Sequence, residues 1–150
     1  MKKSIPVALL TAVLLSLISS LHGLADPPSP EADRLVGRWL TESKDQVEIY
    51  KEADKYFGKG VVTPENKDRL DTKNPDERLR TRPLAHVVIL KDFVYLRKGR
   101  WGKGTIYDPN NGKAYQCTIT MKSDDQIKVR GFIGISLIGR TESWPRVTAE

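Results

Sequence analysis

Catalytic chemistry in this sequence would have to use His86, because the other histidine, His22, lies in an apolar N-terminal stretch. A Ser-His-Asp or Cys-His arrangement would pair His86 with a nucleophile such as Ser136 or Cys117. No Gly-x-Ser-x-Gly motif is present, and Cys117 lies on the apolar side of an alternating run, as a small buried residue would. We therefore name no catalytic residue and expect His86 to be a strand histidine held by packing.

The sequence contains no cluster of residues typical of a metal or cofactor site. A zinc or copper centre needs several converging histidine or cysteine ligands, and the sequence has no such cluster. Glycine-rich phosphate loops, calcium-binding loops and dinucleotide fingerprints are also missing. We therefore expect no metal site and no cofactor.

The sharpest binding hypothesis comes from a basic segment around Arg80 and Arg82. In an extended chain these two side chains point the same way, and arginine forks bind carboxylate or phosphate groups through paired hydrogen bonds. They could clamp the anionic head group of a ligand. The alternative is internal pairing with nearby acidic residues, namely Asp71, Asp76 and Glu77. The predicted ligand-binding residues are Arg80, Arg82, His86 and Tyr115, beside a cavity that Val88, Ile119 and Val129 would help to line.

Short alternating runs predict the strands that must position these side chains. Polar and apolar residues alternate most clearly over 113–122 and 126–133, and the Asp108–Gly112 run is a strong turn signal. The expected strands cover residues 36–41, 46–50, 56–63, 84–90, 93–96, 101–107, 113–122, 126–133 and 136–147. A turn at Lys91-Asp92 separates the fourth from the fifth. No strand–helix–strand rhythm is present, so we expect a mainly β, antiparallel up-and-down barrel of about eight strands, with a two-sheet sandwich as the alternative.

One long polar segment, residues 64–83, interrupts the alternation. Within it Asn74 is expected to cap a short helix that starts at Pro75 and ends near Arg80. A loop of this length in a small domain is usually functional or mobile, and it could cover one end of a barrel.

Residues 1–25 have the pattern of a cleavable export signal. Lys2 and Lys3 precede an uncharged apolar stretch, and Gly23 and Ala25 supply small residues before the cleavage point. The stretch is too short and too interrupted for a spanning helix, and no cysteine follows it that could carry a lipid. We expect residues 26–33 to be a flexible proline-rich lead-in and residues 34–150 to be one domain, periplasmic or secreted, without a membrane anchor.

The charge balance favours a protein that does not bind nucleic acid. The chain carries a formal net charge of +6, and loss of Lys2 and Lys3 with the signal leaves 23 basic and 19 acidic residues. Acids and bases alternate along the chain rather than gathering in one basic block, which is typical of a solvated mixed surface. A single cysteine cannot form an internal disulfide, so a hydrophobic core must hold the domain together.

Two features at opposite ends of the domain resemble the closure of a lipocalin barrel. In lipocalins a Gly-x-Trp on the first strand packs against an arginine from the last strand. Here Gly37 and Trp39 supply the first part, and either Arg140 or Arg146, with Trp144 close by, would supply the second. This resemblance implies a structural role for these residues and no chemistry.

A second resemblance covers nearly the whole domain. The residues that carry it are Gly37-Arg38-Trp39, Asp71-x-x-Asn74-Pro75, Leu79-Arg80-x-Arg82-Pro83-Leu84, Ile106-Tyr107-Asp108-Pro109-x-x-Gly112-Lys113-x-Tyr115-x-Cys117, Val129-Arg130-Gly131-Phe132-Ile133-Gly134 and Leu137-x-Gly139-Arg140-Thr141-x-x-Trp144-x-Arg146-Val147. In combined spacing they resemble the bacterial family of exported domains of unknown function numbered 2147. His86 departs from that pattern, in which a glycine is usual. The resemblance implies a lipocalin-like β domain and no particular activity.

Three functions remain open. The first is a periplasmic module that binds a small amphipathic, apolar or lipid-like ligand inside the barrel. The second is an envelope domain with a filled core that binds a protein partner through its surface. A hydrolase ranks third, since only His86 is available for catalysis.

Overall fold

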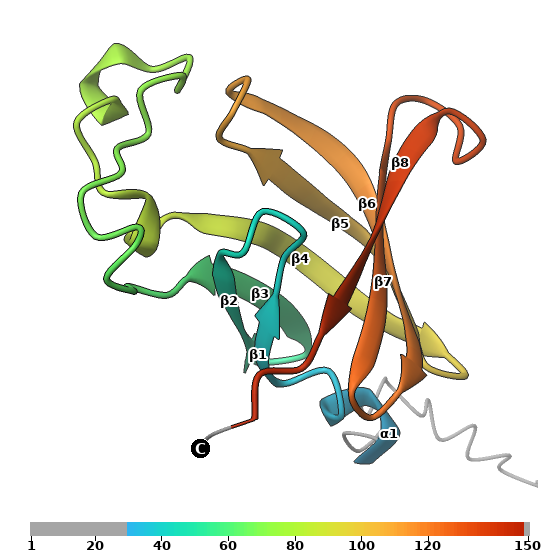
Figure 1. Ribbon diagram of the computed structural model, residues 1–150. Helices are drawn as coiled ribbons and strands as arrows, with labels where there is room; N and C mark the ends of the chain where they lie inside the picture. The colour runs from blue at the N-terminus through green and yellow to red at the C-terminus, as the bar shows by residue number, and fades with distance from the viewer. Residues whose placement is uncertain (1–29, 149–150) are drawn as a thin grey trace, which may run out of the picture.

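Eight antiparallel strands follow one another around a barrel, and each strand pairs with its neighbour in the sequence (Figure 1). The computed structural model describes residues 30–148. The elements are α1 (Pro30–Asp33), β1 (Gly37–Leu40), β2 (Gln46–Glu52), β3 (Lys55–Gly60), the 3-10 helices η1 (Glu77–Leu79) and η2 (Leu84–His86), β4 (Val88–Arg97), β5 (Arg100–Asp108), β6 (Lys113–Ser123), β7 (Gln126–Phe132) and β8 (Gly139–Pro145). The predicted mainly β, up-and-down barrel is confirmed.

The first and last strands meet only near one end, so the barrel is nearly closed. Trp39 and Arg146 form an antiparallel bridge, and the Val147 amide donates to the Arg38 carbonyl at 2.9 Å. Strand β1 has only four residues, which is too short to follow β8 over its full length. The end that carries α1 is therefore the closed end, and the opposite end is open (Figure 1).

The hydrophobic core fills the closed part of the barrel, because alternate residues of each strand point inward. Trp101 is fully buried at its centre, with the rings of Tyr56 and Tyr95 at centroid distances of 6.3 and 5.3 Å. The other strands contribute one or two buried residues each, among them Val47, Ile49, Leu90, Phe93, Cys117, Ile119, Ile127 and Val129. Burial of these side chains supplies the main stabilisation of a domain whose described cysteine, Cys117, is unpaired.

Strand β4 runs without interruption through Lys91 and Asp92, where the sequence predicted a turn between two strands. Asp92 adopts a positive φ of 60°, and Lys91 and Asp92 together lie opposite the single residue Phe57 of β3. This β-bulge absorbs the extra residue without ending the strand. Residues 84–86, expected to begin a strand, form η2 instead.

Two smaller expectations about local structure also need correction. The helix expected to be capped by Asn74 begins later, at Glu77, with Asp76 as its cap through a bond from the Arg78 amide. Asn74 accepts from the Asp76 amide and so forms the preceding turn. Residues 30–33 of the expected lead-in form α1, with Ala32 buried. The predicted signal peptide lies outside the described residues.

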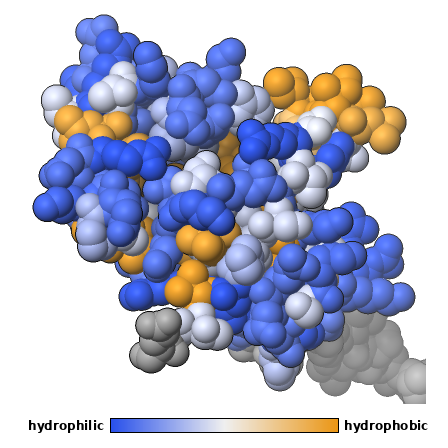
Figure 2. All heavy atoms as spheres, in the orientation of Figure 1, coloured by the Kyte–Doolittle hydropathy of each residue, from blue (hydrophilic) through white to orange (hydrophobic). Residues whose placement is uncertain are grey.

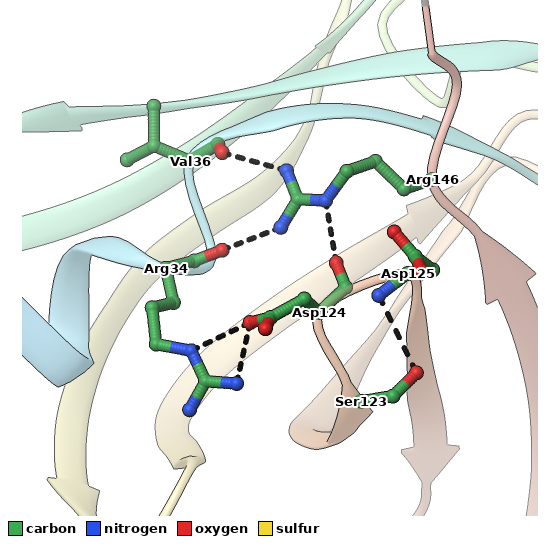
Figure 3. A network of polar contacts seen from close by, with 6 residues as sticks. All are labelled: Arg34, Val36, Ser123, Asp124, Asp125 and Arg146. Carbon is green, nitrogen blue, oxygen red and sulfur yellow. Dashed lines mark hydrogen bonds and ion pairs between the residues drawn. The ribbon is translucent and has the colours of Figure 1, made fainter.

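Arg146 seals the closed end of the barrel (Figure 3). Its guanidinium carbon lies 4.1 Å from the centre of the Trp39 ring, in cation–π geometry. The same group donates to three backbone carbonyls, those of Val36 at 3.0 Å, Arg34 at 2.7 Å and Asp124 at 2.6 Å. One side chain thus ties the chain before β1 to the β6–β7 turn and to the last strand.

Gly37 is required at this contact for a steric reason. Its φ is +139°, and a Cβ atom there would collide with the Arg146 guanidinium. Arg140, the other arginine considered for this role, lies elsewhere and pairs with Glu42. Trp144 is buried next to β7, at the position paired with Ile127.

Replacing Arg146 with alanine is expected to lower the free energy of unfolding by about 2 to 3 kcal/mol, because it removes the ring contact and leaves three carbonyls without their donor. Arg38→Ala is the matched control, since Arg38 is an exposed arginine on β1, the strand that Arg146 closes against. Urea unfolding followed by tryptophan fluorescence measures both. Equal losses in the two variants would contradict a closing role for Arg146.

Candidate functional site: a cavity at the open end of the barrel

The open end of the barrel contains a cavity of about 430 Å³. Its mouth is bordered by the turn between β1 and β2, the turn between β5 and β6, the turn between β7 and β8, and the long segment 61–87. Cavities of roughly 300 to 1,000 Å³ are the usual size for small-molecule sites in proteins. The geometry therefore provides a ligand-sized space that the core does not fill.

The walls of the cavity are mainly apolar because inward-facing positions of several strands converge on it. They come from β2, β4, β5, β7 and β8, and the principal wall residues are Val47, Ile89, Ile106, Val129, Phe132 and Trp144. These walls continue the alternation that builds the core in the closed half. An apolar group would lose little by entering this space.

One carboxylate lies on the inner surface among these apolar residues. Glu142 is half-buried on β8, two residues before Trp144 and on the same side of the strand. It accepts a hydrogen bond of 2.9 Å from the Trp144 indole nitrogen and lies 3.2 Å from Arg140. It supplies a polar contact point inside the cavity.

Charged groups at the mouth occur as pairs rather than as a single-sign patch. Arg69 from the long segment donates to both carboxylate oxygens of Asp45 at 2.8 Å, which joins the segment to the β1–β2 turn. Arg140 bridges Glu142 and Glu42. With Asp108 also present, the lining holds two arginines and three carboxylates, so the charge around the mouth is slightly negative.

Of the four predicted ligand-binding residues, only Tyr115 lines the cavity, and its hydroxyl accepts a hydrogen bond from Asn111. Arg82 donates to Asp71 at 2.8 Å, and Arg80 donates to Glu77 and to the Asn74 carbonyl. The structure therefore has the internal pairing that was the alternative to an anion clamp. His86 is exposed at the end of η2 and is not among the lining residues, although the preceding Leu84 and Ala85 are. Among the other expected wall residues, Val129 lines the cavity and Val88 and Ile119 do not.

Of the two nucleophiles considered with His86, Ser136 is exposed and Cys117 is inaccessible. Cys117 is 1% exposed, and burial raises the pKa of its thiol to about 12, so it is protonated and inert at neutral pH. Within residues 30–148, no group of three potential ligands is arranged to hold a metal ion.

The functional residues that sequence reasoning missed are the paired charges at the mouth. The inward direction of Glu142 could have been predicted, because it lies two residues before the inward Trp144 and alternate residues of a strand point to the same face. The contact between Asp45 and Arg69 spans 24 residues and two loops, and no local pattern indicates it.

Comparison with known proteins agrees with this architecture. A family model described as "Uncharacterized protein conserved in bacteria (DUF2147)" matches residues 37–146. The chain belongs to this family. The range begins at the glycine of the closing motif and ends at Arg146, so the matched unit contains all eight strands of the DUF2147 domain.

Solved structures place the domain beside lipocalins in fold. A Helicobacter pylori protein, HP1028, described as belonging to the lipocalin family, matches with a TM-score of 0.70 and 23% identity over 76% of this chain and 83% of the other. At that identity the similarity shows the fold alone. A redesigned β-barrel matches with a TM-score of 0.44 and 14% identity over 79% of this chain and 96% of the other. A search of curated proteins gives no significant match. Over residues 30–148, the helices of the DUF2147 domain are all too short or too polar to span a membrane.

The long segment of the DUF2147 domain is held at the mouth by one buried carboxylate. Asp71 is fully buried and accepts hydrogen bonds from Asn74 at 2.7 Å, Arg82 at 2.8 Å and the Tyr107 hydroxyl at 2.6 Å. Tyr107 belongs to β5, so this contact fixes the segment to the barrel wall. Gly112, with a φ of +71°, packs directly against the backbone of the same segment, where no side chain would fit.

The environment of Asp71 keeps it ionised in the folded protein. Burial by itself raises the pKa of a carboxyl group, but the hydrogen bonds from Tyr107, Arg82 and Asn74 outweigh it and hold the pKa of Asp71 below its ordinary value. Burial and the adjacent carboxylate raise the pKa of Tyr107 to about 12, so its hydroxyl remains a donor. The charge of Asp71 is therefore required for the arrangement.

Because the pKa of Asp71 is lowered on folding, its stabilisation is complete above the ordinary aspartate pKa of about 4 and is lost as the pH falls through the folded value. We expect Asp71→Asn to cost about 2 to 3 kcal/mol at neutral pH and to flatten the acid side of the stability profile. Asp68→Asn, an exposed change in the same segment, is the control. Urea unfolding between about pH 6 and pH 2 tests this, and an unchanged acid slope in Asp71→Asn would contradict it.

Proposed function

We propose that this domain is an exported binding protein that holds a small amphipathic ligand, with the apolar part inside the barrel and the polar part at the mouth. The observation that carries the proposal is the cavity of about 430 Å³ at the open end. An apolar space joined to a polar rim is complementary to a molecule with one apolar and one polar end.

The charges at the mouth indicate which head groups fit. Arg69 and Arg140 are both neutralised by carboxylates of the protein. An anionic head group would have to displace these partners, whereas an uncharged or zwitterionic one can hydrogen-bond to the pairs as they stand. We therefore favour a single-chain amphiphile with an uncharged or zwitterionic head over a free fatty acid.

Export from the cytoplasm forms part of the proposal. Its support is the sequence of residues 1–25, which combines two lysines, an apolar stretch and small residues at the cleavage point, together with the bacterial family. Within residues 30–148 the core and the Arg146 contact contribute to the stability of the domain. The periplasm or the medium is the proposed location.

The alternative of a filled-core interaction domain accounts for only the closed half of the barrel. There Trp39, Trp101 and their buried neighbours fill the interior. In the open half the strands separate around the cavity, which a domain working only through its surface does not need. Native mass spectrometry of protein purified from its own compartment distinguishes the two, because only a binding module releases a reproducible extra mass on denaturation.

A cavity-filling substitution tests the site directly. Ile106→Trp places a bulky ring in the cavity, whereas Thr105→Trp places the same ring on the outer face of β5. We expect Ile106→Trp to weaken binding of lysophosphatidylcholine by about tenfold or more, since about 1.4 kcal/mol of lost contact is a factor of ten. Thr105→Trp should bind as the unmodified protein does.

Isothermal titration with lysophosphatidylcholine and with dodecanoate measures both parts of the proposal. Tighter binding of the zwitterionic lipid supports the assignment of the head group. Equal effects of the two tryptophan substitutions, or no binding of either amphiphile together with a clean apo mass, would overturn the binding function.

A further inference from the structure

The turn between β7 and β8 exposes a group of aliphatic side chains at the open end of the barrel. Ile133, Ile135, Leu137 and Ile138 are 67%, 60%, 84% and 66% exposed. Figure 2 shows them as an apolar projection at the upper right of the molecule, beyond otherwise polar surroundings. We call these four residues the apolar tip. Clustered exposure of this kind marks a surface that contacts a protein or a membrane.

The outer wall beside the apolar tip is basic. A shallow hollow of about 390 Å³ lies on the outside of β5 to β8 and contains four cationic and four hydroxyl side chains and no carboxylate. These are Arg100, Lys122, Lys128 and Arg130, with Thr118, Thr120, Ser136 and Thr141. We call this surface the cationic wall. None of its four cations forms an ion pair with any residue in the 30–148 range.

Arg130 connects the two surfaces physically. It lies on the cationic wall, and its guanidinium donates to the Ser136 carbonyl in the turn at 2.8 Å and to the Thr141 hydroxyl at 2.7 Å. The apolar tip is thereby fastened to the wall. The turn that carries the apolar tip extends beyond the ends of β7 and β8 (Figure 1), and the four cations lie on β5, β6 and β7.

We propose that the apolar tip and the cationic wall together dock this domain on the surface of an anionic phospholipid bilayer. In this arrangement the four aliphatic side chains enter the boundary of the acyl chains, and the cations and hydroxyls meet phosphate groups of the lipids. Buried apolar area and electrostatic attraction to anionic lipids are the two contributions from which reversible surface binding is built. A bilayer has apolar acyl chains beneath its anionic phosphates, which matches an apolar tip that is followed by a cationic wall.

Docking also brings the cavity to the membrane surface, because Ile133 and Ile138 line the mouth as well as forming the tip. An amphipathic ligand could then pass between bilayer and barrel without crossing water. This consequence rests on the proposed function, but the docking itself does not.

Vesicle co-sedimentation tests the docking. We expect the signal-free protein, residues 26–150, to bind vesicles of phosphatidylglycerol and phosphatidylcholine in equal amounts, to bind vesicles of phosphatidylcholine alone much more weakly, and to dissociate as salt is raised. Binding that is equal on both vesicle types, or no binding to either, would overturn the proposal.

Two substitutions separate the two contributions. Leu137→Asp and Lys128→Glu should each reduce binding to the anionic vesicles by about tenfold or more. Leu137 is 84% exposed, so its replacement should leave the unfolding midpoint unchanged. The matched controls are Val62→Asp and Lys67→Glu, an exposed aliphatic and an exposed lysine on the segment 61–87, and these should bind normally.

Two further results would count against the bilayer. If sedimentation shows a dimer that Leu137→Asp dissociates, and Lys128→Glu leaves vesicle binding unchanged, the tip is an interface between two copies of this chain. The Ile106→Trp variant keeps this test independent of the ligand site: it should lose lysophosphatidylcholine binding and still sediment with anionic vesicles. Loss of vesicle binding in that variant would show that the two functions share one surface, contrary to the proposal.

Discussion

The contact between Arg146 and the Trp39 ring is the constraint on which the rest of this barrel depends. Strand β1 has four residues and meets the last strand through one bridge, which is little backbone pairing for a closure. The guanidinium adds a ring contact and three carbonyl acceptors that belong to separate segments. Because closure is concentrated at this end, β8 is free to diverge from β1 at the other, and the divergence creates the mouth of the cavity.

The open end is held by charge rather than by apolar packing. Segment 61–87 has little core of its own, and the buried carboxylate of Asp71 fixes it to Tyr107 on the barrel wall. A buried charge is costly unless every lone pair is used, so this contact is specific in geometry and intolerant of change. Arg82 is part of it, which explains physically why this arginine is unavailable to an anionic ligand.

Most of the fold could be predicted from alternation, because a half-exposed strand must alternate when one face packs and the other meets water. Strands β6 and β7 follow this rule cleanly, and Gly37 with Trp39 indicated the closure. The bulge at Asp92 was not predicted, because Lys followed by Asp is also typical of a turn. Only the pairing with β3 distinguishes a bulge from a turn at this position. In an extended chain the side chains of Arg80 and Arg82 would point to the same side. The segment contains a 3-10 helix that ends beside Arg80, so this strand alternation does not predict where the two side chains point. The Asp45–Arg69 and Glu42–Arg140 pairs at the mouth join segments distant in sequence, and no local pattern could place them.

The same alternation that fills the core also sorts the outer surface. On β7 the inward positions Ile127 and Val129 bound the core and the cavity, while the outward positions Lys128 and Arg130 form part of the cationic wall. Where the alternation stops, beyond Phe132, apolar residues have no interior to face and remain exposed as the apolar tip. Moving an apolar ligand through water costs free energy in proportion to its exposed area, and that cost is avoided if the mouth of the cavity meets the source of the ligand. Under the proposed function and docking, a tip that continues the apolar wall of the cavity outward, next to cations suited to phosphate, would connect the cavity to the surface from which an amphiphile is taken.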